Sequence, residues 1–199
     1  MHEYLVPLHM LYTFSPLITI LFFIPCVIYQ YHKYGRLQFF RAVVMYVFFL
    51  YLVCMYFYII TPLPSFEYVL ANPLSLKIQL NPFAFIQDFV EQAYWVLTGI
   101  GIVNISHSAW FQVLGNIAIF VPFGIFMRYY FHFSLRQNIL LSFSLTLFFE
   151  LTQLSALYGI YPAPYRIFDI NDLMFNTFGS ILGYSIAPPL TKKLPKIIR

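Results

Sequence analysis

Long stretches without charge constrain this chain more than any other feature of its sequence. Five apolar runs of roughly 20 residues each carry almost no ionisable side chains, and together they occupy about half of the 199 residues. Only 9% of all residues are charged, against about 25% in an average soluble domain. Because so few charges cannot solvate a water-facing surface, the sequence predicts an all-α, polytopic membrane protein.

The five runs predict five transmembrane helices in a single membrane domain that covers residues 1–199. We expect the helices at residues 11–31, 42–60, 109–131, 139–157 and 173–190. Each is about long enough to cross the roughly 30 Å hydrocarbon core of a bilayer. The first run is longer than the core of a signal peptide and follows no basic segment, so we expect it to be retained as a span.

The distribution of basic residues predicts how the spans are oriented. With the amino terminus outside, nine of the eleven Lys and Arg residues fall on the cytoplasmic side, and only Lys77 and Arg166 fall outside. The carboxyl terminus is then inside. Because the net charge of +4 comes from these loop ends rather than from one solvated basic face, nucleic acid is not an expected partner.

The long outer connection, residues 61–108, is too apolar to be a simple tether. Its apolar side chains recur at helical spacing, with polar side chains between them on the opposite face: Ile86, Phe89, Val90, Tyr94 and Leu97 against Gln87, Asp88, Glu91 and Gln92. This pattern predicts an interfacial helix on the outer leaflet. A re-entrant segment at 96–103, which contains Gly99 and Gly101, is the alternative.

One acidic side chain, Glu150, lies deep inside an apolar run. It comes seven residues before the end of the fourth predicted span, about 10 Å below the outer boundary. A carboxyl group at that depth is costly unless it is paired, hydrated or protonated, so such acids are by default functional candidates. Gln153 follows three residues later on nearly the same helical face.

The neighbouring spans carry polar and small residues at helical spacing. In the fifth span the steps are three, four, three and four, at Asp169, Asp172, Asn176, Gly179 and Gly183. The glycines would let another helix approach closely. In the third span the steps are four, at Asn116, Phe120 and Gly124, and Pro122 is expected to bend the helix.

We therefore expect one outward-opening polar pocket, with the Arg166 guanidinium as counter-ion. Its ligand-binding residues would be Asn116, Glu150, Gln153, Arg166, Asp169, Asp172 and Asn176. Two structural interpretations compete with a ligand site: the asparagines would bond helices to one another, and an aspartate would cap the fifth helix. The scattered histidines show no metal-ligand spacing, so neither a metal nor another cofactor is expected.

An ordered set of short motifs lies in the same stretch of chain. They are Asn116–Gly124, Glu150-Leu151-Thr152-Gln153, Arg166 with Asp169, Asn171-Asp172, Asn176-Thr177, Gly179 and Gly183. In this order they resemble the VanZ-like family of bacterial membrane proteins, and Asn81-Pro82-Phe83 resembles the family's outer loop. The resemblance implies a multi-pass protein of the bacterial cell membrane. The family's named member is linked to teicoplanin resistance in Gram-positive bacteria.

Three functions agree with these residues. The one we predict is a non-enzymatic envelope protein whose pocket binds a membrane lipid, a lipid-linked cell-wall precursor or a lipoglycopeptide drug, and so lowers drug accumulation. The alternative is a membrane-embedded enzyme on a lipid-linked substrate, with Glu150 as general base and Asp172 or Asp169 as its partner. A proton-coupled carrier is the third, but the sequence has no inverted repeat. The ligand and the oligomeric state stay open.

Overall fold

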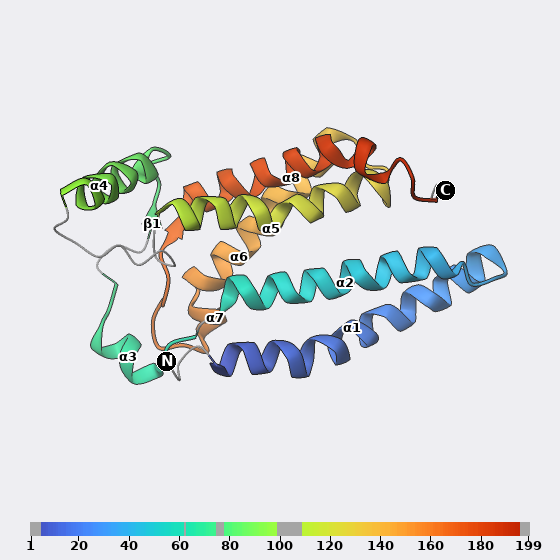
Figure 1. The fold of residues 1–199 in the computed structure, drawn as a ribbon. Coiled ribbons are helices and arrows are strands. Elements are labelled where there is room, and N and C mark those ends of the chain that lie inside the picture. The colour runs from blue at the N-terminus through green and yellow to red at the C-terminus, as the bar shows by residue number, and fades with distance from the viewer. Residues whose placement is uncertain (1–4, 62, 75–77, 99–108, 196–199) are drawn as a thin grey trace. The chain divides into compact units, whose positions relative to one another are not determined.

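The structure is a computed structural model that describes residues 5–61, 63–74, 78–98 and 109–195 (Figure 1). The described residues are mostly helical, as predicted, with two short strands that the sequence did not predict. In chain order the elements are α1 Leu5–Tyr34, α2 Phe39–Ile60, α3 Phe66–Ala71, β1 Ile78–Gln79, α4 Ala84–Thr98, α5 Ala109–Tyr129, α6 Leu135–Leu154, α7 Ala156–Gly159, β2 Phe168–Asp169 and α8 Ile170–Thr191.

Each of the five apolar runs forms a helix. Among the described residues, three helices are long and apolar enough to cross a membrane: Thr13–Tyr34 within α1, α2 and α5. The other two runs form α6 and α8, where polar residues such as Glu150 and Asp172 interrupt the apolar sequence. The all-helical membrane class is therefore confirmed. That α6 and α8 also cross the membrane, and in which direction, stays a prediction.

The chain divides into two compact units, residues 1–71 with 196–199 and residues 72–195. In the first unit α1 and α2 form a helical hairpin in which aromatic side chains meet. The Phe23 and Tyr46 rings pack edge to face at 5.3 Å, and the Phe22 and Phe49 rings stack at 6.1 Å. Every residue of the expected polar pocket belongs to the second unit.

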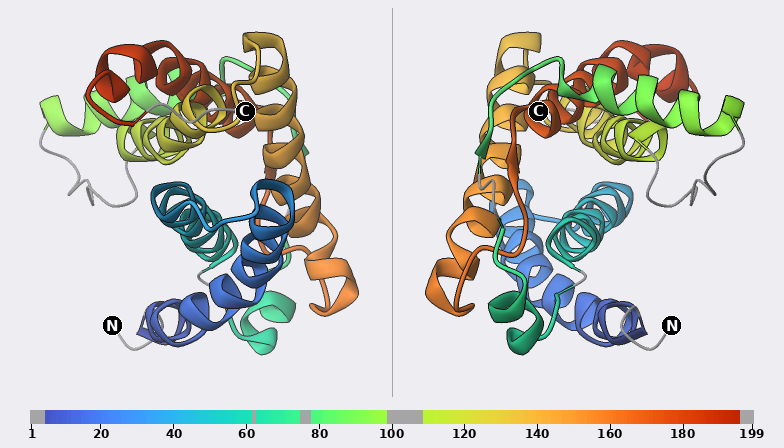
Figure 2. Two further views of the ribbon diagram at one scale, coloured as in Figure 1. Left: turned by 90° about the vertical axis from the view of Figure 1, so that its right-hand side faces the viewer. Right: turned by 90° about the vertical axis from the view of Figure 1, so that its left-hand side faces the viewer.

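In the second unit α5 and α8 run side by side in the same direction (Figure 1). Helix α6 runs back towards their start and crosses them at a steep angle (Figure 2). The helices meet at their backbones. A Cβ atom added at Gly179 would overlap the backbone of Ile117, and one added at Gly183 would overlap the backbone of Val121. At Gly124 it would overlap the carbonyl oxygen of Ser180. These glycines therefore permit the close approach of α5 and α8.

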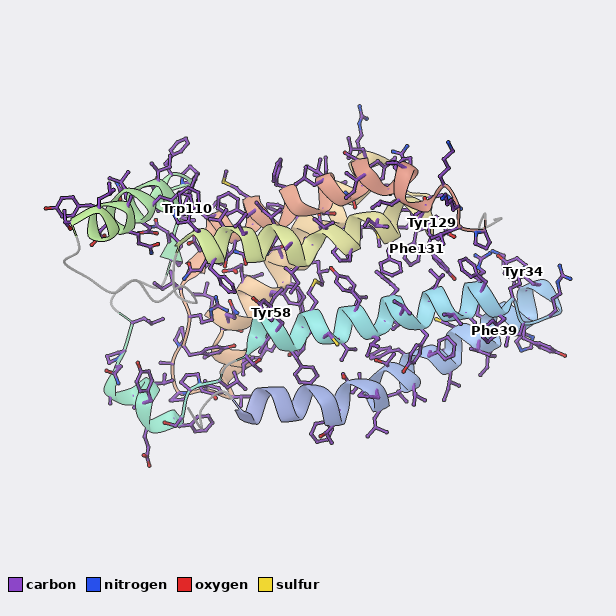
Figure 3. All side chains as sticks on the ribbon, in the orientation of Figure 1. Tyr34, Phe39, Tyr58, Trp110, Tyr129 and Phe131 are labelled. Atoms are coloured by element: carbon purple, nitrogen blue, oxygen red, sulfur yellow. The ribbon has the colours of Figure 1, made fainter. Side chains whose placement is uncertain are left out.

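Helix α4 lies at the end of the second unit where α5 and α8 begin (Figure 1). Trp110 lies at the start of α5 beside α4 (Figure 3). The Phe89 ring of α4 stacks on Trp110 at 3.9 Å, and the Phe85 ring contacts Phe175 of α8 edge to face at 5.1 Å. A helix is thus present at residues 84–98, and that it lies at a membrane interface stays a prediction. The alternative re-entrant segment at 96–103 lies largely outside the described residues.

The start of α6 is fixed by a capping box. The Ser134 hydroxyl oxygen accepts from the Gln137 backbone N–H at 3.3 Å, and the Gln137 side-chain oxygen accepts from the Ser134 N–H at 2.9 Å. Both bonds satisfy donors that a helix start leaves unpaired. This cap places the helix start at Leu135, four residues before the predicted bound of 139.

Removal of this cap is expected to destabilise the second unit modestly. Ser134→Ala should lower its free energy of unfolding by about 1 kcal/mol, since an N-cap hydroxyl is lost. That corresponds to a fall of about 2–4 °C in the thermal midpoint in detergent micelles. Ser134→Thr keeps the hydroxyl and should stay near the wild-type midpoint. Equal midpoints for the two variants would contradict the capping role.

Helix α6 also ends earlier than predicted, at Leu154 rather than at residue 157. Residues Ala156, Leu157 and Tyr158 adopt positive φ angles of 55°, 53° and 57°, a left-handed turn that a right-handed helix cannot include. The Ser155 side chain accepts from the Tyr158 N–H, and the Thr152 and Tyr158 hydroxyls lie 2.7 Å apart. Glu150 consequently lies about 6 Å from the helix end, not the predicted 10 Å.

Candidate functional site

Two carboxyl groups from different helices meet at the centre of the site. Glu150, in the last turns of α6, is only 2% exposed, and Asp172 lies in the first turn of α8. Their side chains lie close enough to interact. Two acidic groups therefore lie together where α6 and α8 meet.

A third helix reaches the same pair. The Asn116 side chain of α5 donates from Nδ2 to Oδ1 of Asp172. Because Asp172 also contacts Glu150, one carboxyl group joins α5, α6 and α8. The asparagine is half-buried and the acid beside it is half-buried as well. The third, fourth and fifth predicted spans thus converge on Asp172.

Asp169 has a different role from the pair. Its backbone N–H donates to Oε2 of Glu150 at 3.0 Å, while its carboxylate accepts from the Asn171 N–H at 2.8 Å and so caps α8. Oδ1 of Asp169 also accepts from Nδ2 of Asn171 at 2.8 Å. The side chain of Asp169 thus caps α8, as one of the structural interpretations predicted. Its backbone N–H holds the Glu150 carboxyl group in place.

The outer connection is bound to the site through its backbone. β1 pairs in parallel with β2, so that Ile78 lies opposite Phe168 and Gln79 lies opposite Asp169. In addition, Nδ2 of Asn171 donates to the carbonyl oxygen of Asn81 at 3.3 Å. The two-residue pairing escaped the sequence analysis because so short a strand has no measurable period. It positions residues 78–81 beside the start of α8.

Arg166 supplies positive charge next to the carboxyl pair. It lies in the segment between α7 and β2, its side chain is exposed, and its guanidinium attracts both Glu150 and Asp172. A buried acid is stabilised by an opposite charge nearby. The exposed guanidinium beside the carboxyl pair is a group of the kind that binds phosphate or carboxylate.

A comparison with protein families agrees with this arrangement. A family model described as VanZ/LLP1 matches residues 48–192, which is most of the chain and includes every candidate site residue. The chain belongs to the VanZ/LLP1 family. Neither the curated proteins nor the solved structures compared with the chain gave a match. It is a VanZ-family membrane protein, consistent with a role in the cell envelope.

The remaining candidates of this VanZ-family chain lie around the same three helices. Gln153 is 1% exposed on α6, and Asn176 is 4% exposed on α8, one turn after Asp172. Among the described residues, no donor reaches Oδ1 of Asn176. Pro122 lies half-buried within the continuous α5. In the described part of the chain, no group of three or more His, Cys, Asp or Glu side chains is arranged so that it could hold a metal ion.

A second polar contact between α6 and α8 was missed by the sequence analysis. The Ser180 hydroxyl donates to Oδ1 of Asn138 at 2.9 Å, and Nδ2 of Asn138 donates to the Ser180 carbonyl oxygen at 3.3 Å. Both residues are fully buried. A signal was present, because four-residue steps connect Asn138, Ser142, Thr146 and Glu150 along one face of α6. That polar face contacts α8.

Proposed function

We propose that this protein crosses the bacterial cell membrane five times with its amino terminus outside. The alternating directions of α5, α6 and α8 within the second unit support this topology, because successive crossings must alternate. The candidate site would then lie near the outer face. Helix α4 supports it too, since Val90 and Leu97 are 65% and 86% exposed and suit the outer membrane interface.

We further propose that the site binds the head group of a membrane lipid or a lipid-linked cell-wall precursor. The observation that carries this proposal is the exposed Arg166 guanidinium beside the buried carboxyl pair. The guanidinium holds an anionic group of the ligand. Engagement of that lipid or precursor lowers the binding of lipid-tailed glycopeptides of the teicoplanin type to their target in Gram-positive bacteria.

The binding function requires no covalent step. A lipid reaches the site laterally, with its chains against the apolar surface of the second unit and its head group at the outer end of α6 and α8. Glu150 and Asp172 hold Asn116 and the Asp169 backbone in place, and so keep the helices together around the head group. Lipid or precursor that is bound at the site is no longer accessible to the drug.

One observation favours the enzymatic alternative. Two carboxyl groups close together are a usual arrangement for paired acid and base catalysis. In that case Glu150 takes a proton from the attacking group of a lipid-linked substrate, and Asp172 holds Glu150 in position. This activity predicts a covalently changed lipid, whereas the binding function predicts an unchanged one. Mass spectrometry of lipid precursor incubated with purified protein separates the two.

Drug susceptibility of cells that express site variants tests the binding function. Arg166→Ala and Glu150→Gln should each return teicoplanin susceptibility to that of cells without the protein, because the anion contact or the carboxyl pair is lost. Glu91→Gln, which neutralises an exposed acid on α4, should behave as wild type. A glycopeptide without a lipid tail should be equally effective against all of these cells. Unchanged susceptibility in both site variants would contradict the proposal.

A further inference from the structure

The site contains a buried hydrogen-bond acceptor that no donor reaches among the described residues. Asp172 accepts from Asn116, and Glu150 accepts from the Asp169 N–H, but Oδ1 of Asn176 has no donor among the described residues. Asn176 is 4% exposed, so bulk water does not satisfy this oxygen. A buried acceptor without a donor costs about 1–3 kcal/mol. An unsatisfied oxygen beside two carboxyl groups points to a ligand that donates.

Asn176 lies on the same face of α8 as Asp172 of the carboxyl pair. Asp172, Asn176 and Ser180 follow one another at steps of four, so they share one face of α8. Asp172 and Ser180, on either side, both contact α6, through Glu150 and Asn138. Asn176 lies between these two contacts along α8. Its side chain therefore faces α6, one helical turn after Asp172.

The charged groups of the site are also unbalanced, with more acidic than basic side chains. Three carboxyl groups lie at the site, those of Glu150, Asp172 and Asp169, and the last caps α8. Arg166 supplies one positive charge near the pair. Acidic side chains therefore outnumber basic ones, and uncompensated charge near hydrocarbon is costly. A ligand that brings a positive charge reduces this imbalance.

From these contacts we propose that the ligand is a zwitterionic lipid whose head group combines a phosphate with a primary ammonium. This identifies the ligand class of the site and rests on the proposed binding function. The phosphate contacts the exposed Arg166 guanidinium. The ammonium lies deeper, where its three N–H donors reach Glu150, Asp172 and Oδ1 of Asn176.

Three lipids with identical acyl chains separate the contributions of charge and of N–H donors. Phosphatidylethanolamine has the phosphate and the primary ammonium. Phosphatidylcholine has the same charges but no N–H donors, and phosphatidylglycerol has no ammonium. Each is titrated into the purified full-length protein in alkyl maltoside micelles, and bound lipid is counted by native mass spectrometry. We expect phosphatidylethanolamine to bind roughly tenfold to a hundredfold more tightly than phosphatidylcholine, from charge-assisted hydrogen bonds.

Variants test whether the carboxyl pair causes the preference for phosphatidylethanolamine over phosphatidylcholine. Glu150→Gln and Asp172→Asn keep the side-chain shape and should bring phosphatidylethanolamine close to the affinity of phosphatidylcholine. Asn176→Leu removes the unsatisfied oxygen and should reduce the preference in part. Glu91→Gln on α4 should retain the full preference. Elution as a single species in size-exclusion chromatography is required of every variant before titration.

The outcomes distinguish this inference from the proposed function. Equal binding of phosphatidylethanolamine and phosphatidylcholine, or a preference that survives Glu150→Gln, overturns the ammonium assignment. Arg166→Ala should weaken all three lipids about equally, since each carries a phosphate. If Arg166→Ala weakens none of them, the anion contact of the proposed function is wrong, whatever the preference among head groups.

Discussion

Replacement of Gly124 by leucine is expected to separate α5 from α8 and to lower the free energy of unfolding of the second unit by about 3 kcal/mol or more. A Cβ atom at Gly124 would overlap the carbonyl oxygen of Ser180 and the backbone nitrogen of Tyr184. Both are backbone atoms, so no side-chain rotation relieves the overlap. The loss should appear as a fall of about 6 °C or more in the thermal midpoint in micelles.

A matched control lies on the same helix. Ala118→Leu adds a comparable volume to α5 at an exposed position and should leave the midpoint nearly unchanged. The site should respond as well, because α5 carries Asn116 and α8 carries Asp172. Loss of lipid binding in Gly124→Leu together with the lower midpoint would support helix separation. Equal midpoints for the two leucine variants would show that these helices do not pack at their backbones.

Helix positions could be predicted from the sequence because long apolar runs have few alternatives. The second span was expected at 42–60 and α2 is Phe39–Ile60, while the third was expected at 109–131 and α5 is Ala109–Tyr129. The fourth is shifted towards the amino terminus at both ends, since its bounds depend on local hydrogen bonds rather than on hydropathy. The Ser134 cap advances its start, and the left-handed turn at 156–158 ends it three residues early.

The proximity of the polar residues could be predicted better than their hydrogen-bond partners. Helical spacing placed Asn116, Glu150 and Asp172 on faces that could meet, and the structure brings these three side chains together. Spacing could not assign partners, because the rotation and crossing of helices depend on backbone packing at the glycines. For the same reason it gave no indication that the Asp169 N–H donates to Glu150.

Substitution of Asp172 tests whether this residue joins the three helices. Asp172→Leu removes the acceptor of Asn116 and the partner of Glu150, and should lower the free energy of unfolding by about 2 kcal/mol or more. Asp172→Asn keeps an acceptor for Asn116 and should cost less than about 1 kcal/mol. Thermal midpoints of both variants in micelles give the comparison, with Glu91→Gln as the control for a lost carboxylate.

A double-mutant cycle isolates the contact between Asn116 and Asp172. Interhelical hydrogen bonds in membranes contribute about 0.6 kcal/mol on average, whereas bonds to charged groups contribute about 1.5–3 kcal/mol. A coupling energy above about 1 kcal/mol between Asn116→Leu and Asp172→Leu would therefore indicate that Asp172 accepts as an ionised carboxylate. A coupling near about 0.6 kcal/mol would indicate a neutral acceptor. Strictly additive effects would contradict the contact itself.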